Sequence, residues 1–63
     1  MSKRQLTISK LQPGLPVNVG KGWMVWQVDA WNLATGVVRI TREDPYGVPI
    51  SQNQPIAALR AAR

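Results

Sequence analysis

Apolar and polar residues alternate along most of this chain with a period of two, which places successive side chains on opposite faces of a β-strand. Turn-forming residues, chiefly glycine and proline, separate the alternating runs. Because proline lacks an amide donor, Pro16 and Pro49 are expected at the first residue of a strand or at a sheet edge. The pattern predicts five short strands, around residues 6–11, 17–19, 23–31, 37–41 and 48–50.

The end of the chain has a different period. Ile56 and Leu59 are spaced to share one face of a helix. Asn53 suits the N-cap of that helix, and Pro55 suits its first turn. We therefore expect a short helix over residues 54–62, which must dock on the sheet because so short a helix is not stable alone.

The longest alternating run holds all three tryptophans and a candidate hairpin turn. Residues 34–36, Ala-Thr-Gly, fit a three-residue loop whose glycine takes the left-handed conformation. With that loop Trp31 lies opposite Arg39 and forms a cation–π pair with it, beside Trp23. A loop of two or four residues would instead place Arg39 on the other face. Trp26 belongs to the wholly apolar face and is expected in the core.

The predicted fold class is all-β: a small five-stranded antiparallel sheet or barrel with a short C-terminal helix, formed by one domain of residues 1–63. Residues 1–5 have no apolar anchor and are expected to be a flexible basic arm. A chain of this length buries only about 60% of the surface that it exposes when unfolded. Homodimerisation is therefore expected to complete the core.

Composition excludes several kinds of site. The chain has no cysteine and no histidine, so disulfides and thiolate or imidazole metal sites are excluded. Three acidic residues are too few and too scattered for a hard-cation site, so neither a metal nor a cofactor is expected. Without a histidine to activate a nucleophile, we expect no enzyme active site within one chain.

The chain is basic, with eight Lys or Arg residues, three acidic residues and a net charge of +5. Such a balance favours polyanionic partners, nucleic acid first, although excess charge also serves solubility alone. There is no apolar run of the length that a signal peptide or membrane span needs. We expect a cytoplasmic protein with no membrane partner.

Basic residues interleaved with tryptophans are the remaining chemical signal, because stacking on tryptophan is worth about 1–3 kcal/mol per unpaired base. We therefore expect a regulator that binds RNA or single-stranded nucleic acid. Burial in the core or at a dimer interface is the alternative for both Trp23 and Trp31. The candidate nucleic-acid-binding residues are Lys10, Trp23, Trp31, Arg39 and Arg42.

The order of elements resembles the carbon storage regulator family of RNA-binding proteins. Residues 6–10, Leu-Thr-Ile-Ser-Lys, look like the opening strand of that family, and residues 38–40 match its Val-Arg-Ile. Gly14, the Val19-Gly20 pair, Pro45 and Val48 fall on further family positions. The resemblance implies an intertwined homodimer that modulates translation by binding GGA-containing mRNA loops. Its RNA surface would use Lys10, while Gln52 stands where the family has an arginine.

A second resemblance is to the SH3-like barrel of the type B dihydrofolate reductases. Residues 27–31 and 55–59 look like segments of that family, and Gln52 would fall on its pore glutamine. Gln54 replaces the pore tyrosine and Asn53 replaces an isoleucine. This resemblance implies a protein-interaction module or a small oligomeric reductase whose active site forms in a tetramer pore.

Overall fold

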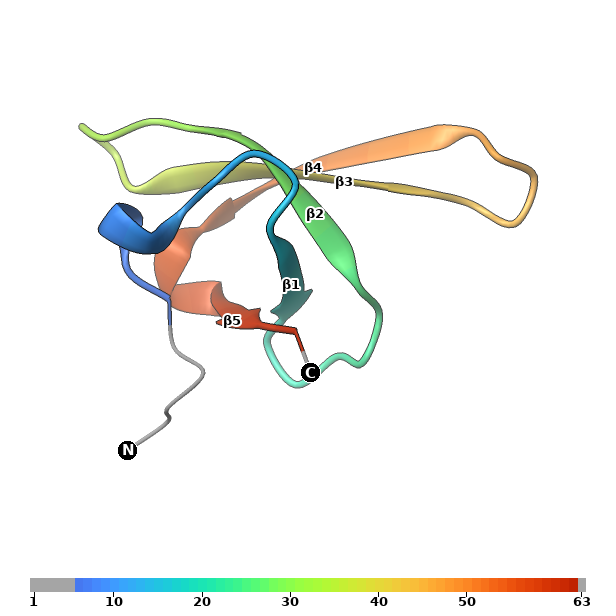
Figure 1. Ribbon diagram of the computed structural model, residues 1–63, viewed down its shortest axis with the longest axis horizontal. Helices are drawn as coiled ribbons and strands as arrows, with labels where there is room; N and C mark the ends of the chain where they lie inside the picture. The colour runs from blue at the N-terminus through green and yellow to red at the C-terminus, as the bar shows by residue number, and fades with distance from the viewer. Residues whose placement is uncertain (1–5, 63) are drawn as a thin grey trace.

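The computed structural model describes residues 6–62 as a five-stranded antiparallel sheet with the strand order β4-β3-β2-β1-β5 (Figure 1). The predicted all-β fold is thus confirmed, and the predicted arm at residues 1–5 lies outside the described residues. Two short 3₁₀ turns, η1 and η2, accompany the strands. The elements are η1 Ile8–Lys10, β1 Pro16–Val19, β2 Trp26–Trp31, β3 Val37–Glu43, β4 Pro49–Pro55, η2 Ile56–Ala58 and β5 Leu59–Ala61.

Strands β3 and β4 form the longest hairpin, whose tip at residues 44–48 projects away from the rest of the molecule (Figure 1). Asp44 shapes this tip, because its carboxylate Oδ1 accepts hydrogen bonds from the amides of Tyr46 and Val48, both at 2.8 Å. Strands β1 and β5 lie on the other side of β2 (Figure 1). The tip of the β3–β4 hairpin therefore extends beyond the part of the sheet that packs around the core.

The core lies on one face of the strands. Val28 pairs with Ile40 across β2 and β3, and both side chains are buried because cross-strand partners share a face. Trp26 is 6% exposed, which confirms its predicted place in the core. The buried apolar residues are Leu6, Leu11, Val17, Trp26, Val28, Val38, Ile40 and Leu59.

The strand predicted at residues 6–11 is wrong. Leu6 and Leu11 are both buried, but an odd spacing would put them on opposite faces of one strand. The chain instead turns between them at η1, where the amide of Lys10 donates to the carbonyl of Thr7 at 3.0 Å. The turn lets both leucines reach the same core.

The helix predicted at residues 54–62 is also wrong. Asn53, its expected N-cap, lies within β4, and η2 is followed directly by β5. A helix of two turns gains few hydrogen bonds for the residues that it orders. As a strand the same segment pairs with β1, where Leu59 lies opposite Val19 and is fully buried.

The two expectations for proline hold. Pro16 is the first residue of β1, and Pro49 is the first residue of β4, which is an edge of the sheet. The last predicted strand is longer than expected, since β4 runs to Pro55.

Candidate functional site

The connection between β1 and β2 holds the most exposed tryptophan of the described residues. Trp23 is 86% exposed, and the neighbouring Met24 and Val25 are exposed as well. The long strand predicted from residue 23 begins only at Trp26, because the chain turns just after β1. The amide of Gly22 donates there to the carbonyl of Val19 at 2.9 Å.

Two contacts anchor this exposed loop to the sheet. The side-chain amide Nδ2 of Asn18, which is buried, donates to the carbonyl of Met24 at 3.0 Å. The amide of Gly20 donates to the carbonyl of Ala58 in η2 at 2.7 Å. Both ends of the loop are therefore fixed, while Trp23 between them faces solvent.

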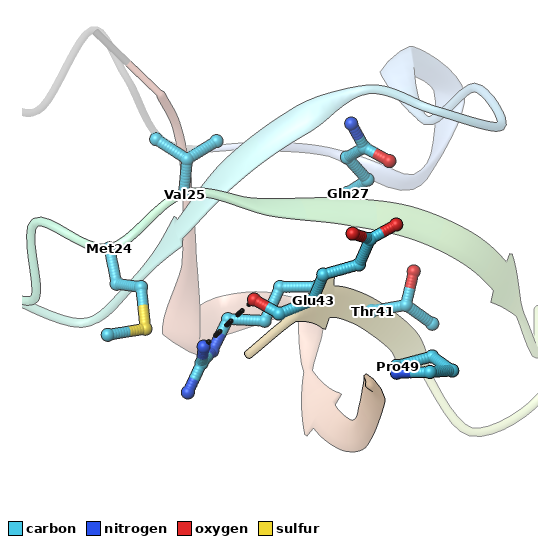
Figure 2. Close-up of a pocket in the computed structure, with 7 residues that line it drawn as sticks. Met24, Val25, Gln27, Thr41, Glu43 and Pro49 are labelled. Atoms are coloured by element: carbon cyan, nitrogen blue, oxygen red, sulfur yellow. Dashed lines mark hydrogen bonds between the residues drawn. The ribbon is translucent and has the colours of Figure 1, made fainter. Parts of the chain in front are cut away.

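A pocket of about 440 Å³ opens between this loop and the β3–β4 hairpin (Figure 2). The loop supplies apolar side chains, β2 and β3 supply polar and charged ones, and β4 supplies a proline. In Figure 2 the carboxylate of Glu43 points toward Gln27 and Thr41. The lining residues are Met24, Val25, Gln27, Thr41, Arg42, Glu43 and Pro49.

Arg42 supplies the positive charge of this pocket. Its guanidinium carbon lies 4.9 Å from the centroid of the Trp26 ring, so the cation rests on an aromatic face. Its Nη1 donates to the carbonyl of Glu43 at 3.3 Å, while its Nε is buried without a hydrogen-bond partner among residues 6–62. Stacking and burial hold the group at the pocket.

The predicted pairing of Trp31 with Arg39 is wrong. The turn between β2 and β3 has four residues, because the amide of Asn32 donates to the carbonyl of Val37 at 2.9 Å. Trp31 consequently lies opposite Val38, on the core side, and is partly buried. Gly36 does take the expected left-handed conformation, with φ +71°.

A bulge at Asp29 shifts the β2–β3 register by one more residue farther along the strands. The register shifts between Val28 and Ala30, so that Ala30 lies opposite Arg39. The Oδ2 of Asp29 lies 3.5 Å from the Nε of Arg39, and both side chains are about half exposed. This ion pair offsets the charge of Arg39 on the outer face of the sheet.

Trp31 and Arg39 still share a hollow. It has a volume of about 360 Å³ and lies beside the β2–β3 turn. Its charged side chain, Arg39, faces the amide side chain of Asn53 across β3 and β4. The residues around it are Ala30, Trp31, Asn32, Thr35, Val37, Arg39 and Asn53.

The five candidate residues therefore fall into separate groups. Trp23 precedes Met24 and Val25, which line the pocket with Arg42, and Trp31 shares the smaller hollow with Arg39. Lys10 is exposed on η1, which lies far from the Trp23 loop in Figure 1.

Sequence reasoning missed the polar lining of the larger pocket. Gln27 and Thr41 are cross-strand partners, and Glu43 lies one pleat farther along β3 on the same face. The correct β2–β3 register places Gln27 and Thr41 together, but only the packing of the loop against the hairpin forms the pocket.

Within residues 6–62 no group of His, Cys, Asp or Glu side chains could hold a metal ion. The same residues contain no helix that is long and apolar enough to cross a membrane. No protein-family model matches the chain, and comparisons with curated proteins and with solved structures find no match either.

Proposed function

We propose that this chain binds RNA or single-stranded nucleic acid and acts as a small regulator of translation. The observation that carries the proposal is Trp23, a large aromatic side chain that is 86% exposed and precedes Met24 and Val25, which line a pocket together with Arg42. Met24 and Val25 are exposed as well, and a run of exposed apolar side chains is typical of an interaction surface.

An unpaired base can stack on the Trp23 ring, since every base has an aromatic face. The guanidinium of Arg42 lines the pocket next to the loop, and Lys21 is exposed two residues before Trp23. These cations suit the phosphates on either side of the stacked base. The net charge of +5 adds attraction at longer range.

Trp31 and Arg39 are a second group of proposed contacts, and Lys10 on η1 is a separate one. The hollow beside Trp31 offers a partly buried ring and an arginine to a neighbouring nucleotide. Asp29 opposes this contact through its ion pair with Arg39. The proposed protein works in the cytoplasm as a homodimer, which would present both groups twice.

Trp23→Ala is expected to weaken binding of a fluorescein-labelled single-stranded RNA by about 5- to 150-fold, the loss of one base stack. Fluorescence anisotropy over a range of salt concentrations measures this affinity, which should fall as salt rises. The melting temperature should stay unchanged, because Trp23 packs on little of the protein.

The matched control is Leu33→Ala, another exposed apolar residue in a turn, which should leave affinity unchanged. Equal affinities for the wild type and Trp23→Ala would reject this surface. Failure of the wild type to bind any RNA or single-stranded DNA at low salt would reject the function.

Asp29→Asn is expected to raise affinity for the same RNA by up to about fivefold, because it frees Arg39 from an exposed ion pair. Arg39→Gln in the same assay should lower affinity. If neither change alters binding, the nucleic acid does not use the outer face of the sheet, and the contact is confined to the Trp23 side.

A protein-interaction module of the SH3-like kind is the second candidate. It is favoured by the apolar exposure of Met24 and Val25 beside Trp23, since extended proline-rich segments dock in aromatic-lined grooves. The related reductase proposal depends on Gln52, which is exposed on β4. A reproducible protein partner in a pulldown favours the first of these, and NADPH-dependent turnover of dihydrofolate favours the second.

A further inference from the structure

Strand β4 is an edge of the sheet with a proline at each end and no charged residue along its length. Ser51, Gln52 and Asn53, at its centre, are all exposed. Natural edge strands commonly carry lysine, another charge or proline, which prevent pairing with a second chain. Pro49 and Pro55 protect the two ends of β4, but residues 50–54 between them carry neither a charge nor a proline.

Hydrogen bonds at both ends of the β3–β4 ladder show which amides of β4 face β3. The amide of Asp44 donates to the carbonyl of Val48 at 2.9 Å, beyond one end. The amide of Ile56 donates to the carbonyl of Gly36 at 2.8 Å, beyond the other. Both pairs continue the register of the ladder, in which hydrogen-bonded and non-bonded pairs alternate.

It follows that Ile50, Gln52 and Gln54 direct their amides and carbonyls to β3. Ser51 and Asn53 direct theirs away from β3, toward the open edge. The two prolines also fall on outward-directed positions, so neither of them removes a hydrogen bond to β3. The open edge thus has donors only at its centre.

We propose that a second copy of this chain pairs antiparallel with the β4 edge, about a two-fold axis at Gln52. In this register Ser51 of each copy lies opposite Asn53 of the other, and the two residues exchange both main-chain hydrogen bonds. Each Pro49 lies opposite Pro55 of the other copy, where neither chain has a donor to lose. The pairing uses every outward amide of β4 and forms about four hydrogen bonds.

Neighbouring registers fit less well. An axis at Ser51 would place Pro55 opposite Gly47, in the turn at the hairpin tip, and would leave part of β4 unpaired. The axis at Gln52 overlaps the whole of β4 with its copy. Two-fold symmetry also sets uncharged residues against each other at every position, so no like charges meet directly across the new ladder.

The interface specifies the homodimer that belongs to the proposed function, yet its formation does not require nucleic acid. A strand pairing at β4 would extend the sheet of one copy into that of the other. It leaves the side chain of Trp23 exposed, because Trp23 lies in the connection that follows β1, while Pro49 at the start of β4 also lines the pocket beside that connection.

A single cysteine tests the axis, since the chain has none of its own. At the axis the two Gln52 Cα atoms form a non-hydrogen-bonded pair about 4.5 Å apart, a separation that a disulfide can span. Mild oxidation of Gln52→Cys should give a covalent dimer at least about ten times faster than oxidation of Tyr46→Cys, at the exposed hairpin tip. Equal rates would overturn the proposed axis.

The double variant Ser51→Pro, Asn53→Pro removes the outward donors and spares the bonds to β3. Sedimentation equilibrium should show a dimer dissociation constant at least about tenfold higher, while the matched Ser51→Ala, Asn53→Ala variant keeps its amides and dimerises like the wild type. A monomeric wild type, or equal dimerisation of both variants, overturns the interface. If the proline variant fails to fold, the cysteine comparison tests the interface. If the wild type binds RNA as a monomer, the β4 interface is rejected and the proposed RNA binding is retained.

Discussion

Trp26→Ala is expected to destabilise the protein by about 3–5 kcal/mol, as large-to-small changes at buried aromatic positions do. Trp26 is 6% exposed and lies opposite Val17, which is fully buried, where β1 pairs with β2. Its ring also supports the guanidinium of Arg42. The change therefore removes both a core side chain and the aromatic ring on which the Arg42 guanidinium stacks.

A loss of this size approaches the total stability expected for a domain of 63 residues, at about 0.05–0.15 kcal/mol per residue. Urea denaturation followed by circular dichroism should show the variant largely unfolded at 25 °C. Trp26→Phe keeps an aromatic face under Arg42 and should retain much of the stability. An alanine variant as stable as the wild type would contradict the placement of Trp26 in the core.

The sequence pattern predicted the central strands because their residues alternate strictly. Val38 and Ile40 face the core while Arg39 faces solvent, as period-two alternation requires. The same reasoning failed at Leu6 and Leu11, whose odd spacing fits a turn between two buried residues. Short apolar patterns at chain ends are compatible with several local structures, and tertiary packing decides among them.

At the candidate site the sequence identified Trp23 and Arg42 as candidates, but it left the exposure of Trp23 open and did not predict the contacts of either residue. The side chain of Asn32 accepts hydrogen bonds from the amides of Ala34 and Thr35, at 2.8 and 3.3 Å. This Asx-type contact draws one more residue into the turn than the glycine position alone suggests. Because of the added residue, Trp31 lies opposite Val38 on the core side and does not pair with Arg39. The observed cation–π contact is instead that of Arg42 with Trp26.

The Trp23 surface and the β4 edge depend on different structural features of the chain. Stacking requires an aromatic residue that is held near cations but not buried, and Asn18 meets that requirement by fixing the main chain at Met24. Strand pairing requires outward amides without charge, and the placement of Pro49 and Pro55 limits these to the centre of β4. A mutation of Trp23 or of the centre of β4 should therefore leave the other surface intact, whereas a mutation of Pro49 would affect both.

Leu59→Ala is expected to destabilise the protein by about 2–5 kcal/mol, since the leucine is fully buried and its removal leaves a cavity. Leu59 lies opposite Val19, so the loss also weakens the pairing that holds β5 on β1.

Leu33→Ala, at a residue that is 75% exposed, should change stability by no more than about 0.5 kcal/mol. Urea denaturation of both variants measures the contrast, and equal stabilities would mean that β5 does not close the core. Because η2 accepts the hydrogen bond from Gly20, weaker docking of β5 should also loosen the Trp23 loop, which faster hydrogen exchange of the Gly20 amide would report in a variant that stays folded.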